Sequence, residues 1–127
     1  MDKLASIRWE GTRLAEAARK APDFYCDAMA QIRMDQWSRG RVTLLGDAGY
    51  CPSPLSGQGT SLALVGAHVL ADCLAQDNGD HRTAYARYEQ RMRPFDTLNQ
   101  ARADENPGGP VSEASLAHAK NALSLDS

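Results

Sequence analysis

Residues 40–48 read Gly-Arg-Val-Thr-Leu-Leu-Gly-Asp-Ala and residues 52–59 read Pro-Ser-Pro-Leu-Ser-Gly-Gln-Gly, and this stretch decides the fold. Residues 41–45 are mostly branched and apolar, which predicts a short buried strand in a parallel sheet. Residues 46–59 hold four glycines and two prolines and predict a long loop. Such a loop is uncommon in a small domain unless it binds something. Residues 60–75 carry small and apolar side chains on every face, which predicts a helix packed on all sides.

The sequence before this stretch predicts one helix and one strand. Residues 9–21 repeat apolar side chains at helical spacing among charged ones, and Pro22 ends the pattern. Residues 23–34 alternate between a mostly apolar and a mixed face, which indicates a strand.

The sequence after residue 76 predicts two further helices. Residues 82–100 place Tyr85, Tyr88, Met92 and Phe95 on one stripe, and Pro94 is expected to kink or divide that helix. Residues 106–110 are rich in proline and glycine and form a break, after which Ser112 could cap a last helix.

Composition narrows the classes of function. The chain has 127 residues, 43% hydrophobic content and a formal net charge of −2, which fits one small domain with no long-range attraction to nucleic acid or an anionic membrane. No apolar run is long enough to cross a bilayer, and no basic and apolar leader begins the sequence, so a cytoplasmic location is expected. Cys26, Cys51 and Cys73 do not cluster with histidines in a metal-ligand pattern, so no metal site is expected.

The central stretch also holds groups suited to binding a flat, hydroxylated ligand. Asp47 directly follows a predicted strand, where a carboxylate can accept hydrogen bonds from ligand hydroxyls. Gly57 and Gly59 allow the backbone to approach a flat ring closely. The first amides of the next helix, near Thr60 and Ser61, would stabilise negative charge.

Residues 40–48, 52–59 and 69–71 together closely resemble the second flavin motif of the aromatic-hydroxylase class (class A) of FAD-dependent monooxygenases. Tetracycline-degrading and p-hydroxybenzoate-hydroxylating enzymes belong to that class. The similarity extends through residues 87–95 and 106–109. Two positions depart from the pattern: Tyr50 stands where many relatives have histidine, and Ser61 where many have asparagine. Neither departure removes a backbone donor.

The resemblance implies an FAD site and assigns roles within it. Asp47 would hydrogen-bond the ribityl chain, residues 54–59 would pass beside the isoalloxazine ring, and the amides of Thr60 and Ser61 would face its pyrimidine end. The implied cofactor-binding residues are Gly46, Asp47, Pro54, Gly57, Gln58, Gly59, Thr60 and Ser61. NADPH or NADH would reduce the FAD, and one oxygen atom would enter a small organic substrate. No catalytic side chain is assigned.

The resemblance also implies which part of such an enzyme this is. Family members begin with a Gly-x-Gly-x-x-Gly turn that holds the FAD pyrophosphate. Residues 57–62 fail at the third glycine of that pattern. We therefore expect an α/β fragment, predominantly helical with few strands, in which a partial FAD/NAD(P)-binding sheet is followed by C-terminal helices.

Three regions and three functions follow as expectations. Residues 1–36 would end a substrate domain, residues 37–76 would form the flavin-contacting strand, loop and helix, and residues 77–127 would form a C-terminal helical region. The chain would be a monooxygenase part that is inactive without its amino-terminal portion, a flavin-free helical module that pairs with another protein or self-associates through apolar faces, or a related reductase or halogenase.

Overall fold

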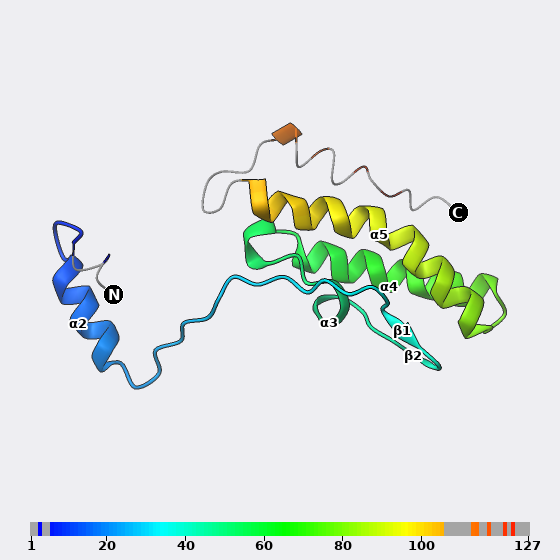
Figure 1. Ribbon diagram of the computed structural model, residues 1–127, viewed down its shortest axis with the longest axis horizontal. Helices are drawn as coiled ribbons and strands as arrows, with labels where there is room; N and C mark the ends of the chain where they lie inside the picture. The colour runs from blue at the N-terminus through cyan, green and yellow to red at the C-terminus, as the bar shows by residue number, and fades with distance from the viewer. Residues whose placement is uncertain are drawn as a thin grey trace.

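The computed structural model describes residue 3, residues 6–105 and the single positions 113, 114, 117, 121 and 123. Two long helices, α4 and α5, lie side by side, and the short elements gather along them (Figure 1). Helix α2 lies apart from this body at the far end of an extended segment. The elements are α2 (Gly11–Lys20), β1 (Ser38–Arg39), β2 (Val42–Thr43), α3 (Asp47–Tyr50), the 3-10 turn η1 (Pro54–Ser56), α4 (Gly59–Gln76) and α5 (His81–Glu105). The expectation of a mostly helical α/β chain with few strands is confirmed.

The two long helices form the core because their apolar residues recur at helical spacing. Tyr88, Met92 and Phe95 of α5 are buried, as their stripe predicts, whereas Tyr85 of the same stripe is only half-buried. Helix α4 is less enclosed than expected: its buried residues are Leu62, Gly66, Val69 and Cys73. Leu64 on another face is 68% exposed, so the prediction of a helix packed on all sides is wrong for this chain.

Helix α5 runs through Pro94 without a break, so the predicted division does not occur. Pro94 is exposed, whereas Met92 and Phe95 on either side of it are buried in one core and hold both halves of the helix in place. The helix changes direction near its middle in Figure 1, as a proline inside a helix produces.

Two predicted strands are absent or shortened. Residues 24–34 are extended but carry no strand pairing, so the strand predicted over 23–34 is wrong. The strand predicted over 41–45 is reduced to Val42–Thr43, which pairs antiparallel with Ser38–Arg39 rather than in a parallel sheet. Both errors have one physical cause: within the described residues, no further strand lies beside either segment to complete a sheet.

Helix α2 confirms the predicted amino-terminal helix, and Pro22 follows its end. The predicted break at 106–110 and the start of the last helix at Ser112 lie outside the described residues. The division of the chain at residues 36 and 76 stays a prediction. Within the part of the chain that the structure describes, no helix has the length and apolar character needed to cross a membrane.

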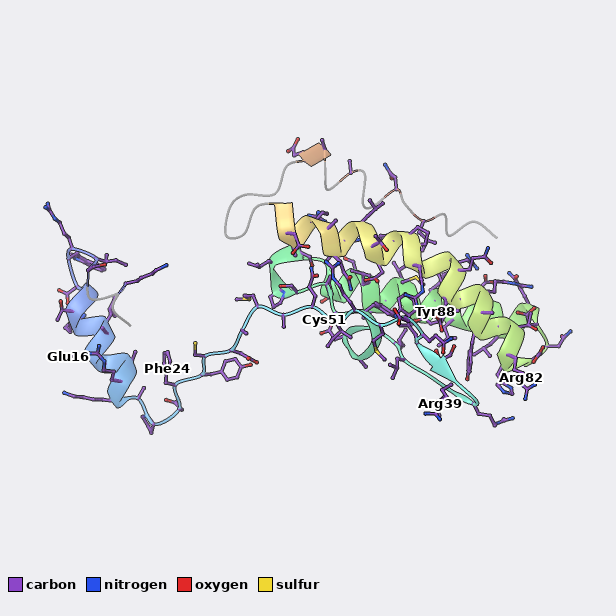
Figure 2. All side chains as sticks on the ribbon, in the orientation of Figure 1. Glu16, Phe24, Arg39, Cys51, Arg82 and Tyr88 are labelled. Atoms are coloured by element: carbon purple, nitrogen blue, oxygen red, sulfur yellow. The ribbon has the colours of Figure 1, made fainter. Side chains whose placement is uncertain are left out.

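A hydrogen bond between two buried tyrosines joins the elements of the core. The hydroxyls of Tyr50 in α3 and Tyr88 in α5 lie 2.8 Å apart, and the Tyr88 hydroxyl donates to the carbonyl of Leu44 at 3.2 Å. Gly66 of α4 makes room for this pair, because a Cβ at that position would lie 2.1 Å from the Tyr50 hydroxyl. Figure 2 labels Tyr88 on α5 and Cys51, the residue that follows Tyr50.

The ring of Trp37 covers this tyrosine pair from the side of the hairpin. Its centroid lies 4.5 Å from that of Tyr50 and 5.9 Å from that of Tyr88. The guanidinium of Arg93 lies over the Trp37 ring, 4.5 Å from its centroid. Trp37 is 2% exposed, whereas Trp9 near α2 is 91% exposed.

We predict that Gly66→Ala destabilises the fold by about 1–3 kcal/mol, since the added methyl displaces the Tyr50 hydroxyl from a filled core. Tyr50→Phe alone is expected to cost about 1 kcal/mol, because it removes one hydrogen bond. Urea unfolding of both single variants and of the double variant measures the coupling. The double variant should lose clearly less than the sum of the single losses; strict additivity would show that the methyl and the hydroxyl do not compete for space.

Candidate cofactor site

The chain turns sharply from the hairpin into α3 at Gly46. This residue has φ 64° and ψ −140°, a conformation that favours glycine. A Cβ at Gly46 would lie 3.2 Å from the Cβ of Ala63, so the backbone here is pressed against α4. The turn places the next residue, Asp47, beside the amino-terminal end of α4.

The Asp47 carboxylate lies next to the first residue of α4. Its Oδ1 atom is 3.7 Å from the position that a Cβ on Gly59 would take. Asp47 is exposed and, with Gly46, Gly59 and Thr60, lines an open pocket of about 390 Å³. The apolar side chains of this pocket are Leu45, Ala63 and Leu64. Residues that are separated by a loop in the sequence therefore share one surface.

The start of α4 offers backbone donors to this pocket. The first intrahelical bond runs from the amide of Leu62 to the carbonyl of Gln58 at 2.9 Å. The amides of Gly59, Thr60 and Ser61 precede that bond, and no side chain caps the helix at Gln58. Together with the positive end of the helix dipole, they make this end of the pocket favourable for negative charge.

The structure separates the other predicted site residues from this pocket. Pro54, Gly57, Gln58 and Ser61 are not among the residues that line it. Pro54 instead lines a second pocket of about 380 Å³, formed with residues 25–29 of the extended segment. Gly57, Gln58 and Ser61 line neither pocket, so the pocket beside Asp47 gathers four of the eight predicted residues: Gly46, Asp47, Gly59 and Thr60.

The predicted loop over residues 46–59 contains helical turns that the sequence did not indicate. Residues 47–50 form α3 and residues 54–56 form η1, within a stretch predicted to have little regular structure. Ser56, which is 1% exposed, holds this loop: its hydroxyl donates to the carbonyl of Ser53 at 2.9 Å and accepts from the amide of Gln58 at 3.1 Å. These bonds fix the approach to the amino-terminal end of α4.

One buried carboxyl was missed by the sequence analysis. Asp96 of α5 is 6% exposed, and its Oδ1 has no hydrogen-bond partner. Burial raises the pKa of Asp96 to about 7, although Arg93 and Arg33 act in the opposite direction. The signal was present, since Asp96 follows Met92 by four residues and so continues the buried stripe. That stripe was assigned from its apolar members alone.

The raised pKa of Asp96 predicts a pH-dependent stability. The pKa of Asp96 in the folded chain lies above the ordinary value for an aspartate. The protonated carboxyl therefore makes its full contribution to the free energy of unfolding below about pH 4, and this contribution is lost as pH rises toward 7. We expect Asp96→Asn to be the more stable protein at pH 8, by up to about 4 kcal/mol. Urea unfolding at pH 4.5 and pH 8 measures the difference, with the exposed Glu16→Gln as a matched charge control. Equal pH dependence in Asp96→Asn and the unaltered chain would contradict the assignment.

The chain is similar in sequence to known proteins. A family model described as "FAD binding domain" matches residues 17–102. The chain is 50% identical over 108 residues to the uncharacterized protein Rv1260 of Mycobacterium tuberculosis, covering 84% of this chain and 29% of that protein. It is 53% identical over 93 residues to a flavin-dependent monooxygenase from an unknown prokaryotic organism, covering 73% of this chain and 24% of that protein.

A solved structure is similar as well. The tetracycline destructase Tet(55) matches with a TM-score of 0.75 and 41% sequence identity, covering 94% of this chain and 36% of that structure. The chain therefore spans about a quarter to a third of the length of these relatives. The resemblance to FAD-dependent monooxygenases, and to the tetracycline-degrading ones among them, is confirmed. Because the family match covers more than half of the sequence, this chain belongs to the FAD binding domain family.

Proposed function

We propose that this chain supplies the flavin-ring side of the FAD site of an FAD-dependent monooxygenase, which uses NADPH or NADH to insert one oxygen atom into a small organic substrate. One observation carries the proposal: the Asp47 carboxylate and the first amides of α4 border the same open pocket. The similarity to flavin-dependent monooxygenases supports it.

The groups around this pocket suit the two ends of the ring-bearing half of FAD. Asp47 can accept hydrogen bonds from the hydroxyls of a ribityl chain. The amides of Gly59 and Thr60, which line the pocket, and of Ser61, which follows them on α4, can donate to electronegative ring atoms and stabilise negative charge. The Asp47 carboxylate lies within ordinary contact distance of the position that a Cβ on Gly59 would take, so the two groups are close neighbours. FAD itself would supply the redox chemistry with oxygen, while the chain binds and orients it.

The other half of the cofactor requires a second polypeptide region. Residues 57–62 lack the third glycine of a pyrophosphate-binding turn. Val42, Leu45 and Leu64 are 66%, 39% and 68% exposed, which is a suitable surface for apolar side chains of another chain or of a second copy. We propose that a region carrying the Gly-x-Gly-x-x-Gly turn packs there and completes the site.

The chain alone should bind FAD weakly or not at all, because nothing in residues 57–62 can hold the pyrophosphate. Titration of the purified chain with FAD, followed by flavin fluorescence and visible absorbance, tests this expectation. Tight binding with one FAD per chain would contradict the need for a complementary region.

Asp47→Ala should weaken FAD retention about 10- to 100-fold in a protein completed with the part of Tet(55) that this chain does not cover. The reason is the loss of one charge-assisted hydrogen bond to a flavin hydroxyl, about 1.5–3 kcal/mol. Flavin content after gel filtration is the measurement. Asp23→Ala, at another exposed carboxylate outside the pocket, serves as the control and should retain its flavin. Unchanged flavin content in Asp47→Ala would remove this side chain from the site.

A further inference from the structure

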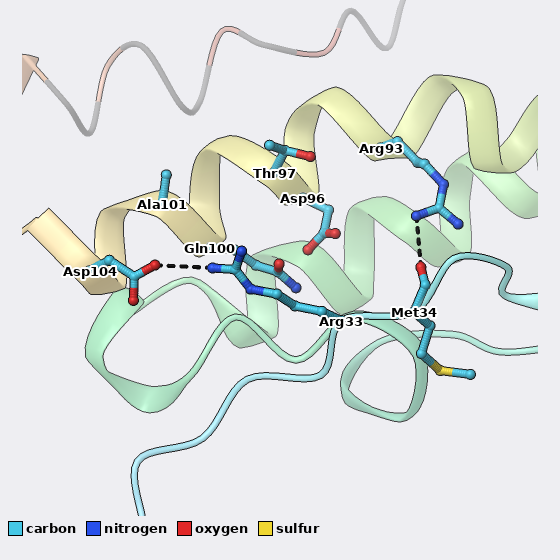
Figure 3. A pocket seen from close by; sticks show the side chains of 8 residues that line it. All are labelled: Arg33, Met34, Arg93, Asp96, Thr97, Gln100, Ala101 and Asp104. Carbon is cyan, nitrogen blue, oxygen red and sulfur yellow. Dashed lines mark hydrogen bonds and ion pairs between the residues drawn. The ribbon is translucent and has the colours of Figure 1, made fainter.

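A second polar pocket lies on the face of α5 that the extended segment crosses. It has a volume of about 260 Å³. Arg33 and Met34 line it from the extended segment, and residues of α5 between Arg93 and Asp104 line it from the helix (Figure 3). It shares no lining residue with the pocket beside Asp47.

The buried carboxyl of Asp96 lines this pocket, and no described residue forms a hydrogen bond to its Oδ1 atom. Figure 3 shows the carboxyl between the side chains of Arg33 and Arg93. Its Oδ1 atom is buried without a hydrogen bond, and Asp96 as a whole is only 6% exposed. Buried carboxylates in folded proteins are normally paired or hydrogen-bonded, since burial without a partner is costly.

Each neighbouring arginine already pairs with another carboxylate. Arg33 Nη2 lies 3.0 Å from Asp104 Oδ2, and Arg33 also donates twice to the Gln31 side chain. Arg93 Nη2 lies 2.9 Å from Glu89 Oε2. The two guanidinium groups therefore already have a carboxylate each, and Asp96 is the third carboxylate.

Arg93 is held still more firmly by the backbone of the extended segment. Its Nη1 donates to the carbonyl of Met34 at 2.9 Å, and its Nη2 donates to the carbonyl of Asp35 at 2.6 Å. Turning Arg93 toward Asp96 would break these bonds.

Burial acts against ionisation of Glu89, but hydrogen bonds from Ser38, Arg93 and the amide of Trp37 keep its pKa below the ordinary value. Glu89 therefore stays ionised and keeps its arginine.

Among the described residues, the two core tyrosines are also titratable groups that interact with Asp96. Burial raises the pKa of Tyr50 and of Tyr88, so both hydroxyls are neutral at physiological pH. The charged groups around the pocket are then two guanidinium groups and three carboxylates. Among the residues that the structure describes, one positive charge is therefore missing whenever Asp96 is ionised.

We propose that this pocket binds a primary ammonium group, which donates a hydrogen bond to Asp96 and provides the missing positive charge. An ammonium group is compact and carries three donors, which suits a pocket lined by the Asp96 carboxyl. An anion would add a fourth negative charge beside Asp96. A metal ion is a poorer candidate, since the described residues contain no group of three His, Cys, Asp or Glu side chains arranged to hold one.

The ammonium group can come from a free amine or from a lysine side chain, and the test includes both. The isolated chain, labelled with 15N, is titrated with propylammonium chloride, with Nα-acetyl-lysine amide and with the neutral analogue propanol. We expect both cations to shift the amide signals of Thr97 and Ala101 saturably, and propanol to shift neither. A response to propylammonium alone would identify a site for free amines. The titration contains no FAD, so its outcome is independent of the proposed flavin site.

The affinity should depend on pH and on Asp96. With a pKa of about 7, the carboxyl is ionised at pH 8.5 and mostly protonated at pH 5.5, so binding should be roughly 30-fold weaker at the lower pH. Asp96→Asn should weaken binding at pH 8.5 at least about tenfold and remove the pH dependence. Glu16→Gln changes the net charge equally at an exposed position of α2 and should leave binding unchanged.

A second variant keeps the test valid if Asp96→Asn does not fold. Ala101 is exposed and lines the pocket, so Ala101→Lys should place an ammonium group there and abolish binding of propylammonium. The proposal is overturned by equal shifts with propanol, by binding that Asp96→Asn leaves intact, by unchanged binding in Ala101→Lys, or by the absence of saturable shifts.

Discussion

The hydrogen bond between Tyr50 and Tyr88 is the constraint on which the rest of the structure depends. It joins α3 to α5, and through the Leu44 carbonyl it also fixes the chain between the hairpin and α3. It can form only because Gly66 leaves space on α4. The same contact sets where Gly46 and Asp47 meet the start of α4, so the geometry of the candidate cofactor site follows from two buried hydroxyls that lie outside it.

The sequence predicted the helices better than the strands, for a physical reason. A helix forms its hydrogen bonds within one segment, so the stripe of Tyr88, Met92 and Phe95 was enough to place α5. A strand needs a neighbour, and a pattern such as that of residues 23–34 shows only that the segment could pair. Here polar side chains hold the segment instead, since Gln31 donates to the Gln100 carbonyl at 2.7 Å and Gln100 donates to the Ile32 carbonyl at 2.8 Å. Such contacts across the chain leave no period in a sequence.

The candidate site was predictable where it rests on a local motif. Gly46, Asp47, Gly59 and Thr60 come together as the order of strand end, loop and helix start indicated. The separation of Pro54 from them depends on η1 and on hydrogen bonds of Ser56, which no local pattern showed. Asp96 was missed because an acidic residue at a buried helical position is read as surface unless its spacing from the apolar residues is counted.

The environment of Trp37 gives the molecule a built-in optical reporter. Its indole is enclosed by two tyrosine rings and the Arg93 guanidinium, whereas the indole of Trp9 is in water. The ultraviolet emission of the chain should therefore contain a short-wavelength component from Trp37, fed by energy transfer from the tyrosines, beside a long-wavelength component from Trp9. Loss of the first component alone would reveal that the hairpin has separated from α5 while the helix at the other end of the chain remains as it was.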